Sequence, residues 1–197
     1  MKKLFLGAAI LVGSLSFAQT FGVKAGMNAS TITDDSDLNE KTKIGYYAGV
    51  FMNAPIAESF SIQPEVLYNN LGSKFSDNDN SATLNLDYIS VPVMFQYNAT
   101  PAFYLEAGPE FGFLVNSKVK SDNAIIEAAG NEIFKKENLN GFNFGVGLGA
   151  GYYFTPNVGL TARYVAGFTD FTKDNSGVSA NSKNKNNTFQ VGLAFKF

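Results

Sequence analysis

The residues of this chain that could do chemistry are five charged residues within otherwise uncharged, alternating stretches: Lys24, Glu65, Glu106, Glu110 and Arg163. Paired carboxylates can act as general acid and base, and carboxylates beside lysine or arginine form ion pairs. Glu106 and Glu110 are four residues apart, which separates them by about 13 Å along a strand. That distance is too long for a direct carboxylate pair, so the spacing favours ion pairing over catalysis.

Catalysis and metal binding have little support elsewhere in the sequence. The chain contains no histidine, so the usual general base of a serine acyl-transfer site and the commonest transition-metal ligand are missing. Two acidic stretches, residues 34–37 and 77–80, offer oxygen ligands for Ca²⁺, but neither has the glycine and closing glutamate of a calcium loop. We expect solvated polar loops there, and a protein that is not an enzyme and needs no cofactor or metal.

The chain begins with the features of a secretory signal peptide. Two lysines precede an apolar block, residues 4–12, and small residues lead up to Ala18. This order predicts a signal peptide over residues 1–18, with one domain over residues 19–197. The apolar block is shorter than the ~20 residues of a membrane-spanning helix. The chain has no cysteine, which excludes both a disulfide framework and a lipid-modified cysteine.

The composition indicates an exterior that does not face water. Charged residues make up 16% of the chain, against roughly 25% in a typical soluble domain. Aromatic residues reach 14%, and the formal net charge is −2. A soluble protein of this length would need more charges to cover its surface, and no basic footprint for nucleic acid exists.

Alternating apolar and polar residues recur along the chain and predict eight strands. The most informative is the last, where Phe189, Phe195 and Phe197 share one apolar face. Such an edge would aggregate in water but suits a barrel whose outer face meets lipid. The predicted strands cover residues 20–28, 43–54, 59–71, 83–97, 102–115, 141–154, 158–171 and 188–197.

Two of these strands have unusual patterns. In residues 141–154 a row of glycines occupies the polar face, which leaves room for large side chains from other strands of a narrow barrel. In residues 83–97 the apolar parity changes after Tyr88, and a β-bulge near residues 88–90 would restore one continuous apolar face. Pro92 fits beside such an irregularity.

The predicted connections alternate between short and long. Short turns fall near residues 55–58, 98–101 and 155–157, and long polar connections lie between them. Outer-membrane barrels have short periplasmic turns and longer external loops. We therefore predict an all-β fold, an eight-stranded antiparallel up-and-down transmembrane β-barrel in the cell outer membrane, with both termini periplasmic. The longest connection contains an apolar segment, residues 124–136, which could form a short helix or extend the strands and is the best candidate for contacting a partner.

A soluble eight-stranded ligand-binding barrel is the alternative fold, with the apolar face inside. Strands of about a dozen residues match a tilted membrane crossing, and the polar face is mostly Gly, Asn, Thr and Ser, too weakly charged for a solvated exterior. Both features favour the membrane barrel.

Four stretches carry a family resemblance: residues 63–68 (QPEVLY), 87–93 (DYISVPV), 104–109 (YLEAGP) and 162–168 (ARYVAGF). They resemble the PorT-like outer membrane β-barrel family, and the resemblance covers nearly the whole mature chain in order. It implies an eight-stranded outer-membrane barrel. The family is named after a member required for a specialised secretion pathway and gliding, but these motifs determine shape and do not distinguish that member from its paralogues.

The interior of an eight-stranded barrel is just wide enough for side chains to fill. Four charged residues lie on the inward-facing parity of their strands near the short-turn end: Lys24, Glu65, Glu106 and Arg163. We expect these four to meet as an ion-paired network, with Glu110 and Asp87 nearer the outer end. Neutralisation of buried charge explains such a network best; a gate whose ion pairs exchange partners is the alternative.

These features predict a non-enzymatic structural or interaction protein that presents loops outside the cell, with a role at a secretion assembly as the resemblance implies. The alternative is a narrow channel for small solutes or ions. The expected partners are outer-membrane lipid, a secretion-system or surface protein, and the barrel assembly machinery. That machinery would read the terminal aromatic pattern of Phe189, Phe195 and Phe197.

Overall fold

The computed structural model describes residues 19–33, 40–77, 80–136, 139–169 and 185–197. The predicted signal peptide (residues 1–18) and the acidic stretch at residues 34–37 lie outside the described residues, as do residues 78–79 of the second acidic stretch. In the part that is described, no helix is long and apolar enough to cross a membrane.

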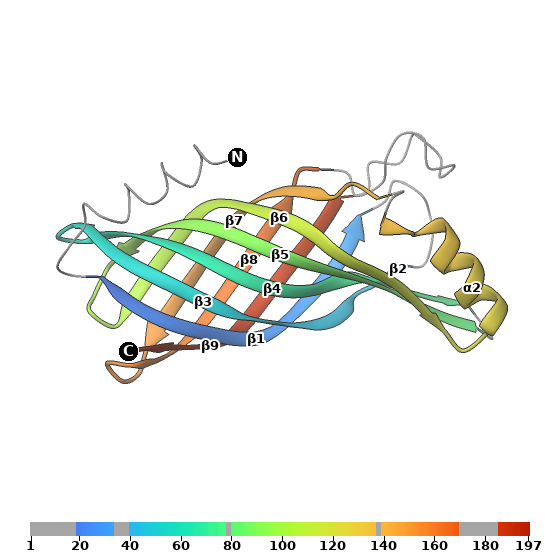
Figure 1. The fold of residues 1–197 in the computed structure, drawn as a ribbon. Helices are drawn as coiled ribbons and strands as arrows, with labels where there is room; N and C mark the ends of the chain where they lie inside the picture. Colours follow the sequence, from blue (N-terminus) through green and yellow to red (C-terminus); the bar gives the residue numbers. More distant parts are fainter. Residues whose placement is uncertain (1–18, 34–39, 78–79, 137–138, 170–184) are drawn as a thin grey trace.

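Eight long strands make up most of the described chain. Each pairs antiparallel with its neighbours, in the order β4-β3-β1-β9-β8-β7-β6-β5, and a pairing of β4 with β5 closes the ring. A two-residue strand, β2 (Glu40–Lys41), adds to β4. The predicted fold, an eight-stranded antiparallel up-and-down β-barrel, is confirmed (Figure 1). The strands are β1 (Thr20–Thr33), β3 (Lys43–Ala57), β4 (Phe60–Asp77), β5 (Asn80–Asn98), β6 (Phe103–Ser121), β7 (Phe142–Tyr153), β8 (Val158–Gly167) and β9 (Lys185–Lys196).

The first and last strands pair with each other along their length. The register runs from Gly22 opposite Lys196 to Thr33 opposite Lys185. The last strand therefore has a partner on each side, β1 and β8. This pairing removes the free edge that an apolar terminal strand would otherwise expose.

Side chains alternate strictly between the two faces of the wall, because successive residues of a strand point to opposite sides. In β1, Phe21 is 55% exposed while Lys24 is 4% exposed. The outer face carries large apolar side chains around the barrel, whereas the inner face carries the buried polar and charged side chains together with two apolar clusters. A soluble domain rarely exposes so much contiguous apolar surface. Exposed members of the outer face include Val50, Val66, Phe95, Leu105, Leu148 and Leu193.

β4, β5 and β6 are the three longest strands and project beyond the barrel (Figure 1). β4, β5 and β6 have 18, 19 and 19 residues, against 12, 10 and 12 in β7, β8 and β9. The helix α2 (Ala124–Ile133) lies beside this projecting sheet (Figure 1). Asn123 caps its first turn by accepting a hydrogen bond from the Ile125 backbone N–H. The longest connection thus both extends the strands and forms a helix.

The predicted β-bulge in β5 is wrong in its position. β5 keeps a regular register with β4 from Asn80 to Tyr97. The irregularity lies opposite, in β6: Asp87 pairs with Asn116 and Tyr88 with Leu114, so Val115 has no partner in β5. The apolar residues of β5 do not form one continuous face. They change from the inner to the outer face after Tyr88, because the surroundings of the strand change there. Leu84, Leu86 and Tyr88 are buried inside the barrel, whereas Phe95 and Tyr97 face outward.

Candidate functional site

The candidate site is an ion-paired network in the barrel lumen. Arg163 donates from Nε to Glu106 Oε1 at 2.7 Å, and from Nη1 and Nη2 to the two oxygens of Glu65 at 3.0 and 2.8 Å. Lys24 Nζ lies 2.8 Å from Glu65 Oε1. The four side chains are between 0 and 3% exposed. Two cations and two carboxylates thus neutralise one another, and the bidentate contact fixes the arginine plane.

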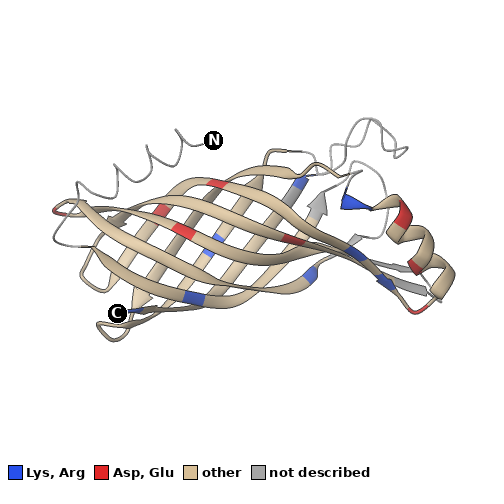
Figure 2. Cartoon of the chain, viewed as in Figure 1, with Lys and Arg blue, Asp and Glu red and all other residues tan. Residues whose placement is uncertain are grey.

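The barrel geometry explains why these four residues meet. Around the ring, Lys24 on β1, Glu65 on β4, Glu106 on β6 and Arg163 on β8 come from every second strand. In closed barrels, inward side chains from alternate strands stack in layers. The network is one such layer. Figure 2 shows that few positions along the strands of the barrel carry a charged residue.

Glycines of β7 make room for this layer. A methyl group at Gly149 would lie 3.0 Å from Glu106 Oε1, and one at Gly147 would lie 3.3 Å from Arg163 Cδ. Both distances are tighter than ordinary van der Waals contact, so β7 supplies space instead of side chains at this level. This matches the room predicted from the glycine row.

Neutral polar side chains complete the network on the short-turn side. Gln63 Nε2 donates to Glu65 Oε1 at 2.8 Å, and Gln96 Nε2 donates to Glu106 Oε2 at 3.0 Å. Sequence reasoning did not identify these amides, although both lie on the inward parity of their strands. Lys43 was also missed: it is buried and donates to Asn70 Oδ1 and to the Leu71 carbonyl oxygen, at 2.5 and 2.9 Å.

Two apolar clusters lie on either side of the network along the barrel axis. At the short-turn end, Phe51, Tyr104, Tyr153 and Ala194 form one cluster, with the two tyrosine ring centroids 6.1 Å apart. The cluster at the long-connection end is larger, and Phe134 packs against it: Leu71, Leu84, Leu86, Tyr88, Leu114, Val119 and Leu139. Among the described residues, side chains therefore fill the lumen at both ends of the network.

Glu110 and Asp87 lie nearer the long-connection end, and neither joins the network. Asp87 accepts hydrogen bonds from Asn70 Nδ2 at 2.6 Å and Asn116 Nδ2 at 2.9 Å. Glu110 is 8% exposed, and its Oε2 has no hydrogen-bond partner in the described structure. No group of three or more acidic, histidine or cysteine side chains in the described ranges could hold a metal ion.

Comparison with known proteins identifies the family. Residues 17–173 match the family model described as "Outer membrane protein beta-barrel domain". The chain belongs to this family. Its place is accordingly the outer membrane, where the apolar outer face of the barrel contacts lipid.

Solved structures support the same fold. Ail, the attachment invasion locus protein of Yersinia pestis, is 13% identical, with a TM-score of 0.52 over 92% of this chain and 100% of that chain. Neisserial surface protein A is 12% identical, with a TM-score of 0.52 over the same shares of the two chains. At this identity the likeness concerns the fold alone. A comparison with curated protein sequences gave no match.

The lumen network of this outer-membrane barrel lies in the lipid-covered part of the wall. Leu105 and Ala107 are the neighbours of Glu106 in β6, and both point outward and are exposed. Tyr164, beside Arg163 in β8, is exposed in the same way. Lipid outside and packed side chains inside leave these charges no bulk water, so each charge depends on its partners. The arrangement is suited to holding the wall together.

Proposed function

We propose that this outer-membrane barrel is a non-enzymatic surface protein that holds a protein-binding platform outside the cell. The platform consists of α2 and the projecting ends of β4, β5 and β6. The observation that supports it is the exposure of apolar residues on α2: Ile125 is 80% exposed and Ile126 is 37% exposed. Exposed apolar residues that form a patch on a water-facing surface mark interaction sites.

Hydrogen bonds to β6 hold α2 in place. Asn131 Oδ1 accepts from the Val119 N–H at 2.8 Å, while Asn131 Nδ2 donates to the Val119 carbonyl oxygen at 3.2 Å. Ser117 Oγ donates to the Phe134 carbonyl oxygen at 2.8 Å. A helix fixed in this way loses little conformational freedom when a partner binds, which favours affinity.

The orientation follows from the turns. The short connections and the Phe197 end lie at one end of the barrel, and α2 lies at the other (Figure 1). Because outer-membrane barrels have their short turns in the periplasm, we propose that both termini are periplasmic and that α2 faces the exterior.

A secretion assembly is the partner class that the PorT-like resemblance favours. The stretches that carry the resemblance include Glu65, Glu106 and Arg163, three of the four residues of the lumen network. These stretches form part of the barrel interior, whereas the proposed platform lies on α2 and the projecting strand ends. The choice of a secretion component therefore depends on the resemblance alone, and the barrel assembly machinery is proposed from the aromatic end of β9.

Site-specific photo-crosslinking in intact cells tests the platform. A benzophenone side chain at position 125 should give a defined adduct with one secretion or surface protein, and Ile126→Asp should abolish that adduct. An acidic residue in the first helical turn favours the helix, so this loss would not reflect unfolding. The matched control is position 148 on the lipid-facing wall, where Leu148 is 67% exposed. Equal protein adducts at both positions, or none at position 125, would contradict the proposal.

A narrow channel is the second candidate function. Its support is Glu65 Oε1, which accepts from Lys24, Arg163 and Gln63 and so has partners to exchange. The apolar clusters at both ends of the network favour the closed state. Planar-bilayer recording of the refolded barrel separates the two functions, because reproducible single-channel steps would support the channel over the purely structural barrel.

A further inference from the structure

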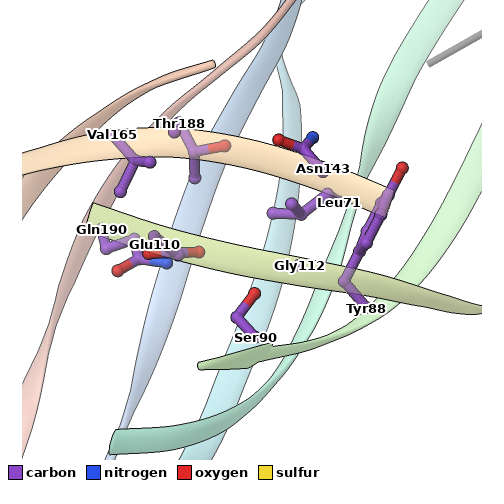
Figure 3. A pocket seen from close by; sticks show the side chains of 10 residues that line it. Leu71, Tyr88, Ser90, Glu110, Gly112, Asn143, Val165, Thr188 and Gln190 are labelled. Carbon is purple, nitrogen blue, oxygen red and sulfur yellow. The ribbon is translucent and has the colours of Figure 1, made fainter. Parts of the chain in front are cut away.

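A small cavity lies in the lumen between the network and the outer apolar cluster. Its volume is about 20 Å³, enough for a single guest of the size of a water molecule. Figure 3 shows the side chains around it, with the carboxyl group of Glu110 among them. The polar residues that line it come from four strands: Tyr88 and Ser90 of β5, Glu110 of β6, Asn143 of β7, and Thr188 and Gln190 of β9. The apolar side chains of Leu71 on β4 and Val165 on β8 also line it.

The oxygen atoms around the cavity are held in fixed directions. Asn69 Nδ2 donates to Ser90 Oγ at 2.9 Å, and Ser90 lines the cavity together with Glu110. Gln190 Nε2 donates to Asn69 Oδ1 at 3.1 Å. The amide nitrogen of Gln190 is thus engaged, which leaves its oxygen as the atom available to a guest. Glu110 Oε2 has no hydrogen-bond partner among the described residues.

With Glu110 ionised, the buried charges of the described lumen do not balance without a guest. The buried cations are Lys24, Lys43 and Arg163, and the buried carboxylates are Glu65, Asp87, Glu106 and Glu110. Three positive and four negative groups leave one negative charge in excess. The network neutralises two of the carboxylates, and Lys43 lies near Asp87 through their shared partner Asn70. Glu110 is the remaining carboxylate.

We propose that this cavity binds one small monovalent cation, of the size of Na⁺, through Glu110 Oε2. Hydroxyl and amide oxygens of Ser90, Thr188, Asn143 and Gln190 would complete its coordination, since hard cations prefer oxygen ligands. A single carboxylate matches a single positive charge, and a buried carboxylate without a counter-charge is costly. A water molecule would satisfy the hydrogen bond but not the charge. This site is independent of the proposed surface function.

Thermal unfolding of the purified full chain in detergent tests the site. The midpoint should be higher in NaCl than in N-methyl-D-glucamine chloride of equal ionic strength, by roughly 5–10 °C at about a hundredfold excess of Na⁺ over its dissociation constant. Glu110→Gln should remove this difference. The exposed Glu132→Gln is the matched control and should keep it.

A second variant covers the case in which Glu110→Gln fails to fold. Thr188→Val keeps the shape and the carboxylate but removes one ligand oxygen, so the Na⁺ concentration for half-maximal stabilisation should rise several-fold. Crystals soaked in Tl⁺ should show anomalous density beside Glu110 Oε2. Equal midpoints in the two salts, as for a cavity with water alone or a protonated Glu110, would overturn the proposal. A Na⁺ effect that survives Glu110→Gln would overturn it as well.

Discussion

The lipid-covered wall and the projecting outer sheet of this barrel have opposite chemistry on their two faces. In the first region, which we call the membrane zone, Phe95 and Leu105 face outward while Glu65 and Arg163 lie inside. In the second, the outer zone, formed by the ends of β4, β5 and β6, Leu84 and Val119 lie inside. There the outward positions are polar, as Lys74, Lys118 and Lys120 are exposed.

The difference shows that one continuous sheet can meet two solvents. In the membrane zone the exterior is apolar because it contacts lipid, so the narrow interior holds the polar side chains. In the outer zone water surrounds the sheet, and the ordinary pattern of soluble proteins returns, with apolar residues inside. The change of parity after Tyr88 in β5 is where the two patterns meet, and the bulge at Val115 lies at the same level in β6.

The largest effect is expected from Arg163→Ala in the membrane zone. Removal of the guanidinium leaves Glu65 without one partner and Glu106 without its cation, which should cost about 3–5 kcal/mol of unfolding free energy. Denaturant unfolding of the refolded barrel measures this loss. Single-channel conductance should not rise, because both apolar clusters remain.

A surface ion pair provides the control for that variant. Lys135→Ala breaks the exposed contact of Lys135 with Glu132 and should change stability by less than about 1 kcal/mol. A similar loss of unfolding free energy from the two variants would mean that the buried lumen network contributes no more to stability than an exposed ion pair. A large conductance increase in Arg163→Ala would favour the gate.

Leucines in the two zones should respond differently to truncation. Leu86→Ala removes a side chain that is 1% exposed in the outer apolar cluster, and the cavity left behind should cost about 2–5 kcal/mol. Leu148→Ala on the lipid-facing wall leaves no cavity and should cost about 1 kcal/mol or less. The same unfolding assay compares them. Equal losses would show that the outer zone lacks a packed apolar core.

The smallest effect on stability is expected at the end of β9. Phe197 is 74% exposed, and its deletion removes a backbone hydrogen bond to the Phe21 carbonyl oxygen and a ring contact with Phe195. The loss of these contacts should cost little stability, yet the amount of folded barrel in cells should fall if the assembly machinery reads the terminal aromatic pattern. Heat-modifiable migration of membrane fractions on a gel measures that amount. Unchanged amounts would refute the role of Phe189, Phe195 and Phe197 as an assembly signal, and equal in vitro refolding yields would separate recognition from stability.

Much of the fold could be predicted, because lipid covers the outside of the barrel and the lumen is narrow. Apolar and polar residues therefore alternate regularly along each strand of the membrane zone. The same parity placed Lys24, Glu65, Glu106 and Arg163 on the inner face. The sequence also placed Glu110 and Asp87 nearer the outer end. Which atoms of the network pair with one another could not be predicted, since the stagger between strands decides which inward residues share a level.

The outer zone was the harder part to predict. The strand over residues 20–28 continues to Thr33, and that over residues 59–71 continues to Asp77, because water-exposed strands with polar outer faces resemble loops in composition. The bulge was assigned to the wrong strand because its position depends on cross-strand pairing, which no single strand encodes.

The most direct test of the two-zone account is the depth of outward positions along β5. The chain has no cysteine, so single variants Thr83→Cys, Asn85→Cys, Val93→Cys and Phe95→Cys can each carry one fluorescent label. In vesicles with brominated acyl chains, labels at positions 93 and 95 should be strongly quenched, whereas labels at positions 83 and 85 should not. Equal quenching at all four positions would contradict the account, since the parity change would then not mark the edge of the membrane.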